Sequence, residues 1–209
     1  DHLSPRVYAF GLLSTGEHSA GAQLLGVDPE LEVRLTSFLN GVAEGLTHSA
    51  EDHPLLLGDV LAQELEATVG SEIAVVTQSA DGSLGNDLFH VSGILHTGLR
   101  YLDRTLAVFP LSDLQELLAL NPDEIHEIAM SIKDPMLAKR FAEGLNDSAF
   151  LPSASVAQSW GDLAPQLRDY IGLVQGMYGF LIVSIALFVA VGVLNTMMMA
   201  VFERTREIG

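Results

Sequence analysis

The side chains best suited to bind a metal ion lie together in one acidic stretch, HSAEDH. It contains His48, Glu51, Asp52 and His53. Imidazole and carboxylate groups are common zinc ligands, and a loop can bring three of them together. The spacing matches no established zinc motif, however, so a solvated acidic loop is the better interpretation. We therefore predict no metal ligands on this chain.

Three further histidines, His90, His96 and His126, are scattered along predicted strands or at strand ends. Histidines in such places are commonly surface or partly buried residues. A membrane-anchored metalloenzyme would instead need a clustered His and Asp site, which elemental analysis of the purified domain would reveal.

In residues 81–87, DGSLGND, the alternation of Asp81, Ser83, Gly85 and Asp87 is like the start of a calcium loop. Such a loop needs glycine at its sixth position and glutamate at its twelfth. Asn86 and Ser92 occupy these positions here, which argues against calcium.

No sequence pattern points to catalysis. The glycine-rich stretches never form a GxxxxGK(S/T) phosphate loop, and no serine lies in a GxSxG turn. The chain has no cysteine, which excludes a thiol nucleophile and a disulfide framework. We predict no catalytic residues and no cofactor on this chain.

The 209-residue chain has a formal net charge of −17. Negative charge repels the phosphates of nucleic acids, so we expect no nucleic-acid partner. It also repels anionic lipid headgroups, so the acidic part should stand off a membrane.

One segment is long enough to cross a lipid bilayer. Residues 177–202 contain no charged side chain, and a helix that rises ~1.5 Å per residue then spans a hydrocarbon core of ~30 Å. Arg204 and Arg206 follow it, whereas the nearest preceding basic residue is Arg168. Basic residues favour the cytoplasmic side, so we predict a cytoplasmic C-terminal end and an extracytoplasmic N-terminal part.

Asn195 lies inside this apolar segment, three residues after Gly192. An amide surrounded by hydrocarbon needs a hydrogen-bond partner. We predict that Gly192 and Asn195 contact another transmembrane helix. The alternative is an incidental amide satisfied by its own backbone.

The first elements expected before this segment are strands over residues 7–14 and 22–27. Asp28-Pro29 ends the second strand, and apolar residues at helical spacing predict a helix over residues 35–42. Gly58-Asp59 opens a second helix that ends near Gly70. Strands then cover residues 73–77 and 88–95, and the long connection over 78–87 should form a loose, mobile tip.

Later elements follow from local capping signals. Residues 112–115, SDLQ, form a capping box ahead of a short helix. Residues 126–133 alternate like a strand, and Asp134-Pro135 then caps a helix. Asp162 should cap the last helix, with Pro165 in its first turn and continuity from about Leu163 into the membrane. The fold class predicted is an α+β domain in two lobes, followed by a long stalk and transmembrane helix.

Residues 192–209, GVLNTMMMAVFERTREIG, resemble the second transmembrane helix and coupling segment of FtsX/MacB-type ABC transporter permeases, which include lipoprotein-releasing permeases. Four earlier stretches resemble that family's periplasmic domain in order and spacing. They are LLGVDPE at 24–30, LLLGDVLAQELEATVGSEI at 55–73, FHVSGILHTGLRYLD at 89–103 and FPLSDLQELL at 109–118.

The resemblance implies a permease of the bacterial inner membrane with four transmembrane helices. Residues 1–158 would be part of an extracytoplasmic, periplasmic domain, 159–176 a stalk helix, 177–202 the transmembrane helix, and 203–209 the start of a cytoplasmic coupling segment. The chain would then be a fragment, without the other three helices and the start of the domain.

The resemblance also implies partners: a second permease copy or homologue in a dimer, a cytoplasmic ATP-binding subunit that carries ATP and Mg²⁺, and a periplasmic lipoprotein or carrier. Glu203, Arg204 and Glu207 would couple the permease to the ATPase by charge pairing, the alternative being ordinary charges at a membrane flank. The leading function is ATP-driven mechanotransmission for lipoprotein release or export of an amphiphilic substrate. The alternative is a non-transporting transmitter that activates a periplasmic partner such as a cell-wall hydrolase.

Overall fold

The two N-terminal strands that the sequence predicts are present, and they pair as an antiparallel hairpin. The computed structural model describes residues 2–47, 53–148, 150–152 and 154–208. In it, β1 (His2–Ser14) pairs with β2 (Ser19–Val27) in a register that runs from Arg6↔Val27 to Ser14↔Ser19. Gly16 adopts a φ of 94° in the connecting turn, where a left-handed conformation favours glycine.

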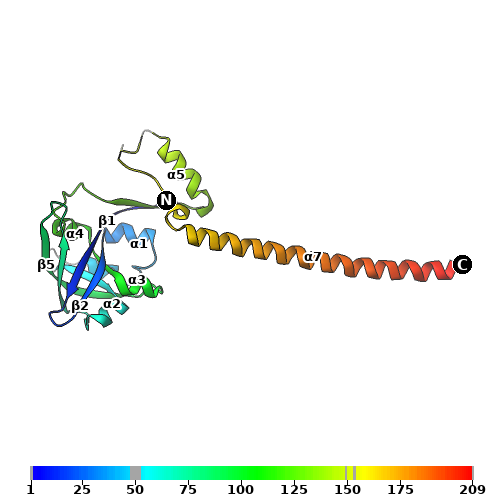
Figure 1. Cartoon of the computed structure of the whole chain (residues 1–209), viewed down its shortest axis with the longest axis horizontal. Coiled ribbons are helices and arrows are strands. Elements are labelled where there is room, and N and C mark those ends of the chain that lie inside the picture. The colour runs from blue at the N-terminus through cyan, green and yellow to red at the C-terminus, as the bar shows by residue number, and fades with distance from the viewer. Residues whose placement is uncertain (1, 48–52, 149, 153, 209) are drawn as a thin grey trace. The chain divides into compact units, whose positions relative to one another are not determined.

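Among the described residues, seven strands form one sheet that closes on itself (Figure 1). Its order is β2-β6-β3-β5-β4-β1-β7, and β1 also pairs with β2, so β1 to β6 form a closed barrel. β7 extends the sheet by pairing antiparallel with the first residues of β1. The bounds are β3 (Pro54–Gly58), β4 (Glu72–Gln78), β5 (Leu84–Leu95), β6 (Leu106–Pro110) and β7 (Glu127–Ser131).

Apolar side chains from all six barrel strands form the main core. Phe89 and Phe109 are fully buried at its centre and meet edge to face, with ring centroids 4.9 Å apart. Helices α2 (Asp59–Glu64) and α4 (Leu111–Leu117) add Leu61 and Leu114 to the same core. Burial of large aromatic and aliphatic side chains is the main stabilising term of such a barrel.

A second, smaller apolar core is formed by a different set of side chains on β2, β3 and β6. It includes Leu25, Leu56 and Val108, and it is covered by Leu39 and by Leu46 from η1 (Ala43–Leu46). Because successive side chains of a strand point to opposite faces, these strands serve both cores. This double burial explains why β3 and β6 show no alternation in sequence.

Four local predictions in this part of the chain were wrong. The second helix does not extend to Gly70: α2 ends at Glu64, because Glu66 adopts a left-handed φ of 51° that ends the helix. The helix expected over 35–42 is α1 (Pro29–Leu35), because the Asp28 carboxylate accepts hydrogen bonds from the backbone of Glu30 and Leu31 and Pro29 fits the first turn. Leu39 lies beyond the end of α1 and is buried in the smaller core.

The tip expected over 78–87 is much shorter, because the β4–β5 ladder extends to Gln78↔Leu84. The Ser79 hydroxyl donates to the Leu117 carbonyl at 3.0 Å and joins the turn to α4. The capping box over 112–115 does not form either: α4 begins at Leu111, and the Gln115 amide donates to the carbonyls of Pro122 and Glu124 instead.

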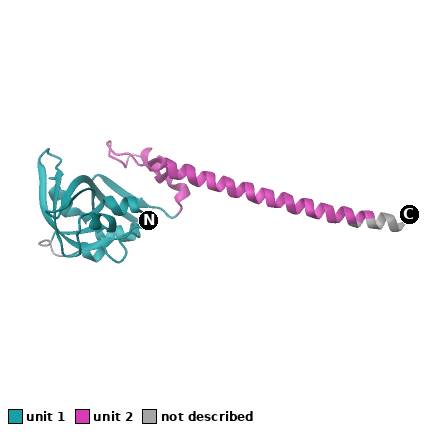
Figure 2. Cartoon of the chain, turned by 60° about the horizontal axis from the view of Figure 1, so that its bottom comes forward, with its two compact units in different colours: residues 1–133 teal, residues 134–209 magenta. Residues whose placement is uncertain are grey.

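Residues 1–133 and 134–209 form two compact units (Figure 2). The second begins with the predicted cap, since Asp134 accepts from the backbone of Met136 ahead of η2 (Pro135–Leu137) and α5 (Ala138–Asn146). A mixed sheet and helix domain followed by a long apolar helix confirms the predicted fold class. How residues 1–158, 159–176, 177–202 and 203–209 divide about a membrane stays a prediction.

Candidate functional site

The long C-terminal helix begins at Pro165, two residues later than predicted. Ser159 and Asp162 form a capping box for the short helix α6 (Trp160–Leu163), and Ala164 leaves helical geometry. The new helix α7 (Pro165–Ile208) then starts at the proline and continues unbroken for 44 residues. The Asp162 cap therefore belongs to α6, because its carboxylate accepts from Ser159.

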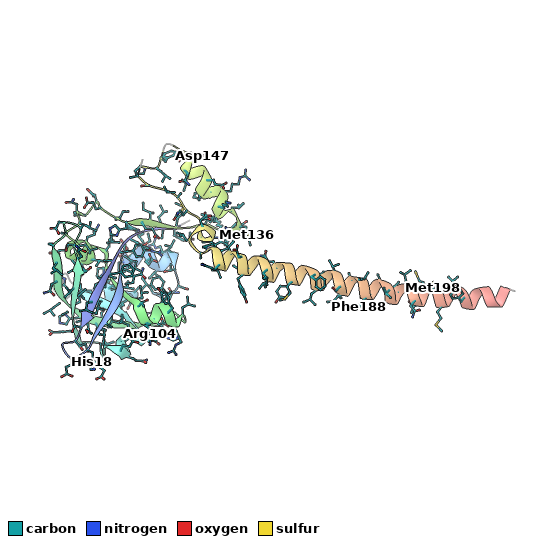
Figure 3. The ribbon with its side chains drawn as sticks, viewed as in Figure 1. His18, Arg104, Met136, Asp147, Phe188 and Met198 are labelled. Carbon is teal, nitrogen blue, oxygen red and sulfur yellow. The ribbon has the colours of Figure 1, made fainter. Side chains whose placement is uncertain are left out.

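α7 is apolar on every side over most of its length. Its stretch Pro165–Met199 is long and apolar enough to cross a membrane, and none of its most apolar part is buried by the rest of the described chain. Side chains such as Phe188 and Met198 project from it in different directions (Figure 3). An isolated helix with such a surface requires lipid or other helices around it.

Polar groups within the apolar stretch are partly satisfied by the helix itself. The Ser184 hydroxyl donates to the Phe180 carbonyl at 2.8 Å, and the Thr196 hydroxyl donates to the Gly192 carbonyl at 3.0 Å. Asn195 is exposed, and a Cβ placed on Gly192 would meet nothing within 4 Å. Both positions are open to a neighbouring helix, and the predicted contact stays a prediction.

The proposed coupling residues lie in the last two turns of α7. Glu203, Arg204 and Glu207 are helical, but their side chains lie outside what the structure describes. Their role in coupling therefore stays a prediction.

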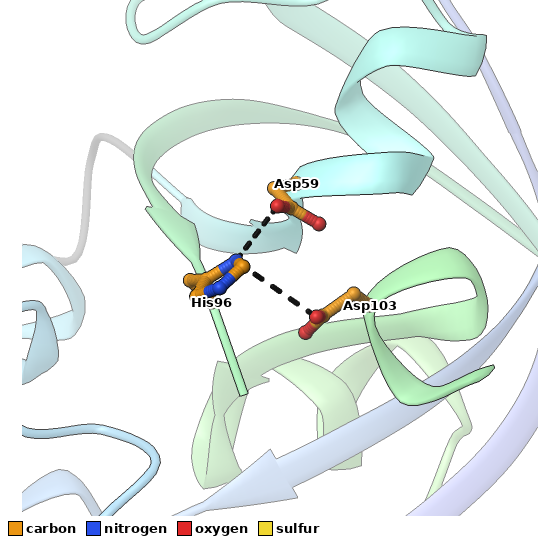
Figure 4. A group of neighbouring side chains, drawn as sticks. All are labelled: Asp59, His96 and Asp103. Atoms are coloured by element: carbon orange, nitrogen blue, oxygen red, sulfur yellow. Dashed lines mark hydrogen bonds and ion pairs between the residues drawn. The ribbon is translucent and has the colours of Figure 1, made fainter. Parts of the chain in front are cut away.

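A cluster that sequence spacing did not reveal lies at one end of the barrel (Figure 4). β3 and β5 run parallel with Gly58 opposite Leu95, so the residues that follow them, Asp59 and His96, emerge side by side. His96 Nδ1 lies 2.8 Å from Asp59 Oδ2 and 3.9 Å from Asp103 Oδ2 on helix α3 (Arg100–Thr105).

The three side chains differ in environment. The side chain of Asp103 is 2% exposed and that of His96 is 75% exposed. Hydrogen bonding to Asp59 and attraction to both carboxylates raise the pKa of His96. Burial opposes ionisation of Asp103, but hydrogen bonds from Thr97 outweigh it and lower the pKa of this carboxyl. Asp103 is therefore a carboxylate held in place below an exposed imidazole.

Gly58 allows the segments that carry this cluster to pack closely. A Cβ at this position would collide with the carbonyl oxygen of Asp103 and lie 2.7 Å from its carbonyl carbon. We expect Gly58→Ala to destabilise the barrel by about 1–3 kcal/mol, because backbone atoms must move to accept the methyl group. Gly21→Ala is the matched control, since a Cβ there meets nothing within 4 Å. Thermal unfolding that is equally affected by both changes would contradict this packing.

The other histidines and acidic residues considered as metal ligands lie in several separate places. His48, Glu51 and Asp52 of the HSAEDH stretch lie outside the described residues, while His53 Nδ1 lies 3.9 Å from carboxylate oxygens of Asp87 and Asp113. In the stretch that resembles a calcium loop, Asp81 accepts from the backbone of Ser83 and so stabilises the turn. His90 lies 3.4 Å from Glu72, and His126 Nδ1 accepts from the Tyr8 backbone.

Comparison with known proteins gives relatives but no family model that matches. The chain is 27% identical to the lipoprotein-releasing system transmembrane protein LolE of Haemophilus influenzae, over 99% of this chain and 50% of that protein. It is 24% identical to the corresponding LolC proteins of Neisseria meningitidis serogroup B and Xylella fastidiosa, over 98% of this chain. The chain spans about half the length of these curated relatives.

Among solved structures, the extracellular domain of the noncanonic ABC-type transporter YknZ from Gram-positive bacteria matches with a TM-score of 0.48. It is 14% identical over 70% of this chain and 75% of that chain. The sequence relatives confirm the resemblance predicted from the residues: over nearly its whole length, this chain is similar to the transmembrane proteins of lipoprotein-releasing systems.

Proposed function

We propose that this chain is part of a permease subunit of an ATP-driven transporter that releases lipoproteins from the bacterial inner membrane. The observation that carries the proposal is its similarity to LolE and LolC proteins over almost all of its length. The unbroken helix α7, which joins a polar start to a long apolar stretch, supports a membrane-embedded role.

In this proposal residues 1–158 lie in the periplasm, residues 177–202 cross the inner membrane, and residues 203–209 reach the cytoplasm. Arg204 and Arg206 support that orientation, because basic residues near a span favour the cytoplasmic side. α7 carries no charged side chain between Asp169 and Glu203. The apolar stretch can therefore lie in lipid without burying a charge.

The proposed complex contains a second permease copy or homologue and a separate cytoplasmic ATP-binding subunit, which holds ATP and Mg²⁺. Closure of the ATPase dimer would move the end of α7, and the continuous helix would pass this motion towards the periplasmic side. A helix suits this role because each backbone group is hydrogen-bonded along it. A lipoprotein, or its carrier, would then be the periplasmic partner.

The proposal is tested with the full-length permease and its ATPase in proteoliposomes loaded with an acylated lipoprotein. The expected result is lipoprotein release that requires ATP. ATP hydrolysis without release, accompanied by activation of an added cell-wall hydrolase, would instead support a transmitter.

The same assay tests the coupling residues. We expect Glu203→Ala with Arg204→Ala to insert normally, because Arg206 still marks the cytoplasmic flank. Release per ATP hydrolysed should fall partially, because charge pairs at an interface contribute about 1.5–7 kcal/mol when close and desolvated but only about 0–1 kcal/mol when exposed. If the double variant hydrolyses ATP and releases lipoprotein as the wild type does, these residues are ordinary charges at the membrane flank.

A further inference from the structure

The cluster of Asp59, His96 and Asp103 has the composition of a transition-metal site. Each residue offers one ligand atom, and these atoms all lie within 4.8 Å of one another. One imidazole nitrogen and two carboxylate oxygens form a set typical of zinc, whereas calcium and magnesium prefer oxygen ligands alone. We propose that these three side chains bind a zinc ion.

The two distances from His96 to the carboxylates lie on either side of the ligand spacing in a zinc site. Tetrahedral ligands at ~2.0–2.1 Å from zinc lie ~3.3–3.4 Å apart. His96 Nδ1 is 2.8 Å from Asp59 Oδ2 and 3.9 Å from Asp103 Oδ2, so the two distances bracket that value. Small side-chain rotations would bring the three atoms around one ion without movement of the strands.

An unsatisfied oxygen gives independent support. Asp59 Oδ1 is shielded from solvent and has no hydrogen-bond partner among the described residues. A shielded carboxylate oxygen without a donor is costly. A cation bound at Oδ2, the oxygen that faces His96, would offset the negative charge of this carboxylate.

Asp103 is already oriented for ligation by its neighbour. Its Oδ1 accepts hydrogen bonds from the Thr97 backbone at 2.8 Å and from the Thr97 hydroxyl at 2.7 Å. These bonds leave Oδ2 facing His96, as outer hydrogen bonds do for ligating carboxylates. The exposure of His96 leaves room for water or another group as a fourth ligand.

The test uses full-length protein purified in detergent, stripped with a chelator and titrated with zinc sulfate against a chromogenic chelator. We expect one equivalent of zinc per chain. His96→Ala and Asp59→Asn should each weaken binding by at least ~10-fold, the scale known for losses around metal sites. The matched control is His90→Ala, which removes a histidine within β5 that also lies near a carboxylate, and this variant should bind zinc as the wild type does.

Cobalt(II) provides a second readout, because its visible spectrum reports nitrogen and oxygen ligands in a four-coordinate site. The spectrum should appear in wild type and be lost in His96→Ala. Melting of the metal-free variant should match the wild type, since His96 is largely exposed. If the wild type does not bind one equivalent of zinc, or if both cluster variants bind zinc as tightly as the wild type, the proposal is overturned. The cluster is then only a hydrogen bond between His96 and Asp59.

Discussion

Replacing Arg6 with methionine should lower the free energy of unfolding by about 3–5 kcal/mol, the typical cost of breaking a buried ion pair. The Arg6 guanidinium lies 2.6 Å from Glu32 Oε1, and its Nε donates to Oε2 at 3.2 Å. The side chain of Glu32 is fully buried and that of Arg6 is 16% exposed. Without Arg6, the Glu32 carboxylate remains buried without a cationic partner, although the Thr36 hydroxyl still donates to it at 3.1 Å.

A double variant separates lost pairing from lost packing. Arg6→Met with Glu32→Leu removes both charges, and such replacements are often close to neutral. We expect it to recover much of the stability lost in Arg6→Met, as measured by denaturant unfolding. Equal stability of Arg6→Met and wild type would contradict a structural role for the pair.

The pair also predicts a dependence on pH. Burial opposes ionisation of Glu32, but the hydrogen bonds and charge of Arg6 outweigh it and lower the pKa of this carboxyl below its ordinary 4.5. The unfolded state therefore binds the proton more readily. The stabilisation is present above pH 4.5 and is lost as the pH falls through the lower folded-state pKa. Glu32→Gln should remove this part of the acid dependence.

The second large effect is expected in α7. Phe188 lies near the middle of the uncharged stretch, and its side chain is exposed. Phe188→Arg should disfavour membrane insertion by about 2.5–3.5 kcal/mol, because an arginine at the centre of a span must be moved out of water. Insertion of the α7 segment is measured by glycosylation mapping in a reporter protein.

Phe188→Leu is the control for the change in shape, and it should insert as the wild type does because leucine is equally well accepted by lipid. If the arginine variant also inserts like the wild type, α7 is not held in the bilayer by this stretch.

Local signals predicted those elements that depend on neighbouring residues. The β1–β2 hairpin, the Asp134 cap and the long helix all arise from contiguous patterns of residues. β3 and β6 were missed because nearly every residue in them is buried, so neither shows the alternation that identifies a half-buried strand. Barrel closure was missed because β1 pairs with three strands distant from one another in sequence.

The cluster could not be found from spacing alone. Asp59 and His96 are 37 positions apart, and only the parallel pairing of β3 with β5 brings the ends of these strands together. Recognition of residues 55–58 and 91–95 as neighbouring parallel strands would have predicted that Asp59 and His96 meet. Asp103 joins them because Gly58 permits α3 to approach closely.

The most direct test of the central claim is purification of the full-length permease from its native membrane in mild detergent. The proposed function predicts that a nucleotide-binding subunit co-purifies with it, and that the complex hydrolyses ATP. The 209 residues contain no GxxxxGK(S/T) phosphate loop. Recovery of ATP-dependent lipoprotein release from a preparation without any nucleotide-binding subunit would contradict the account.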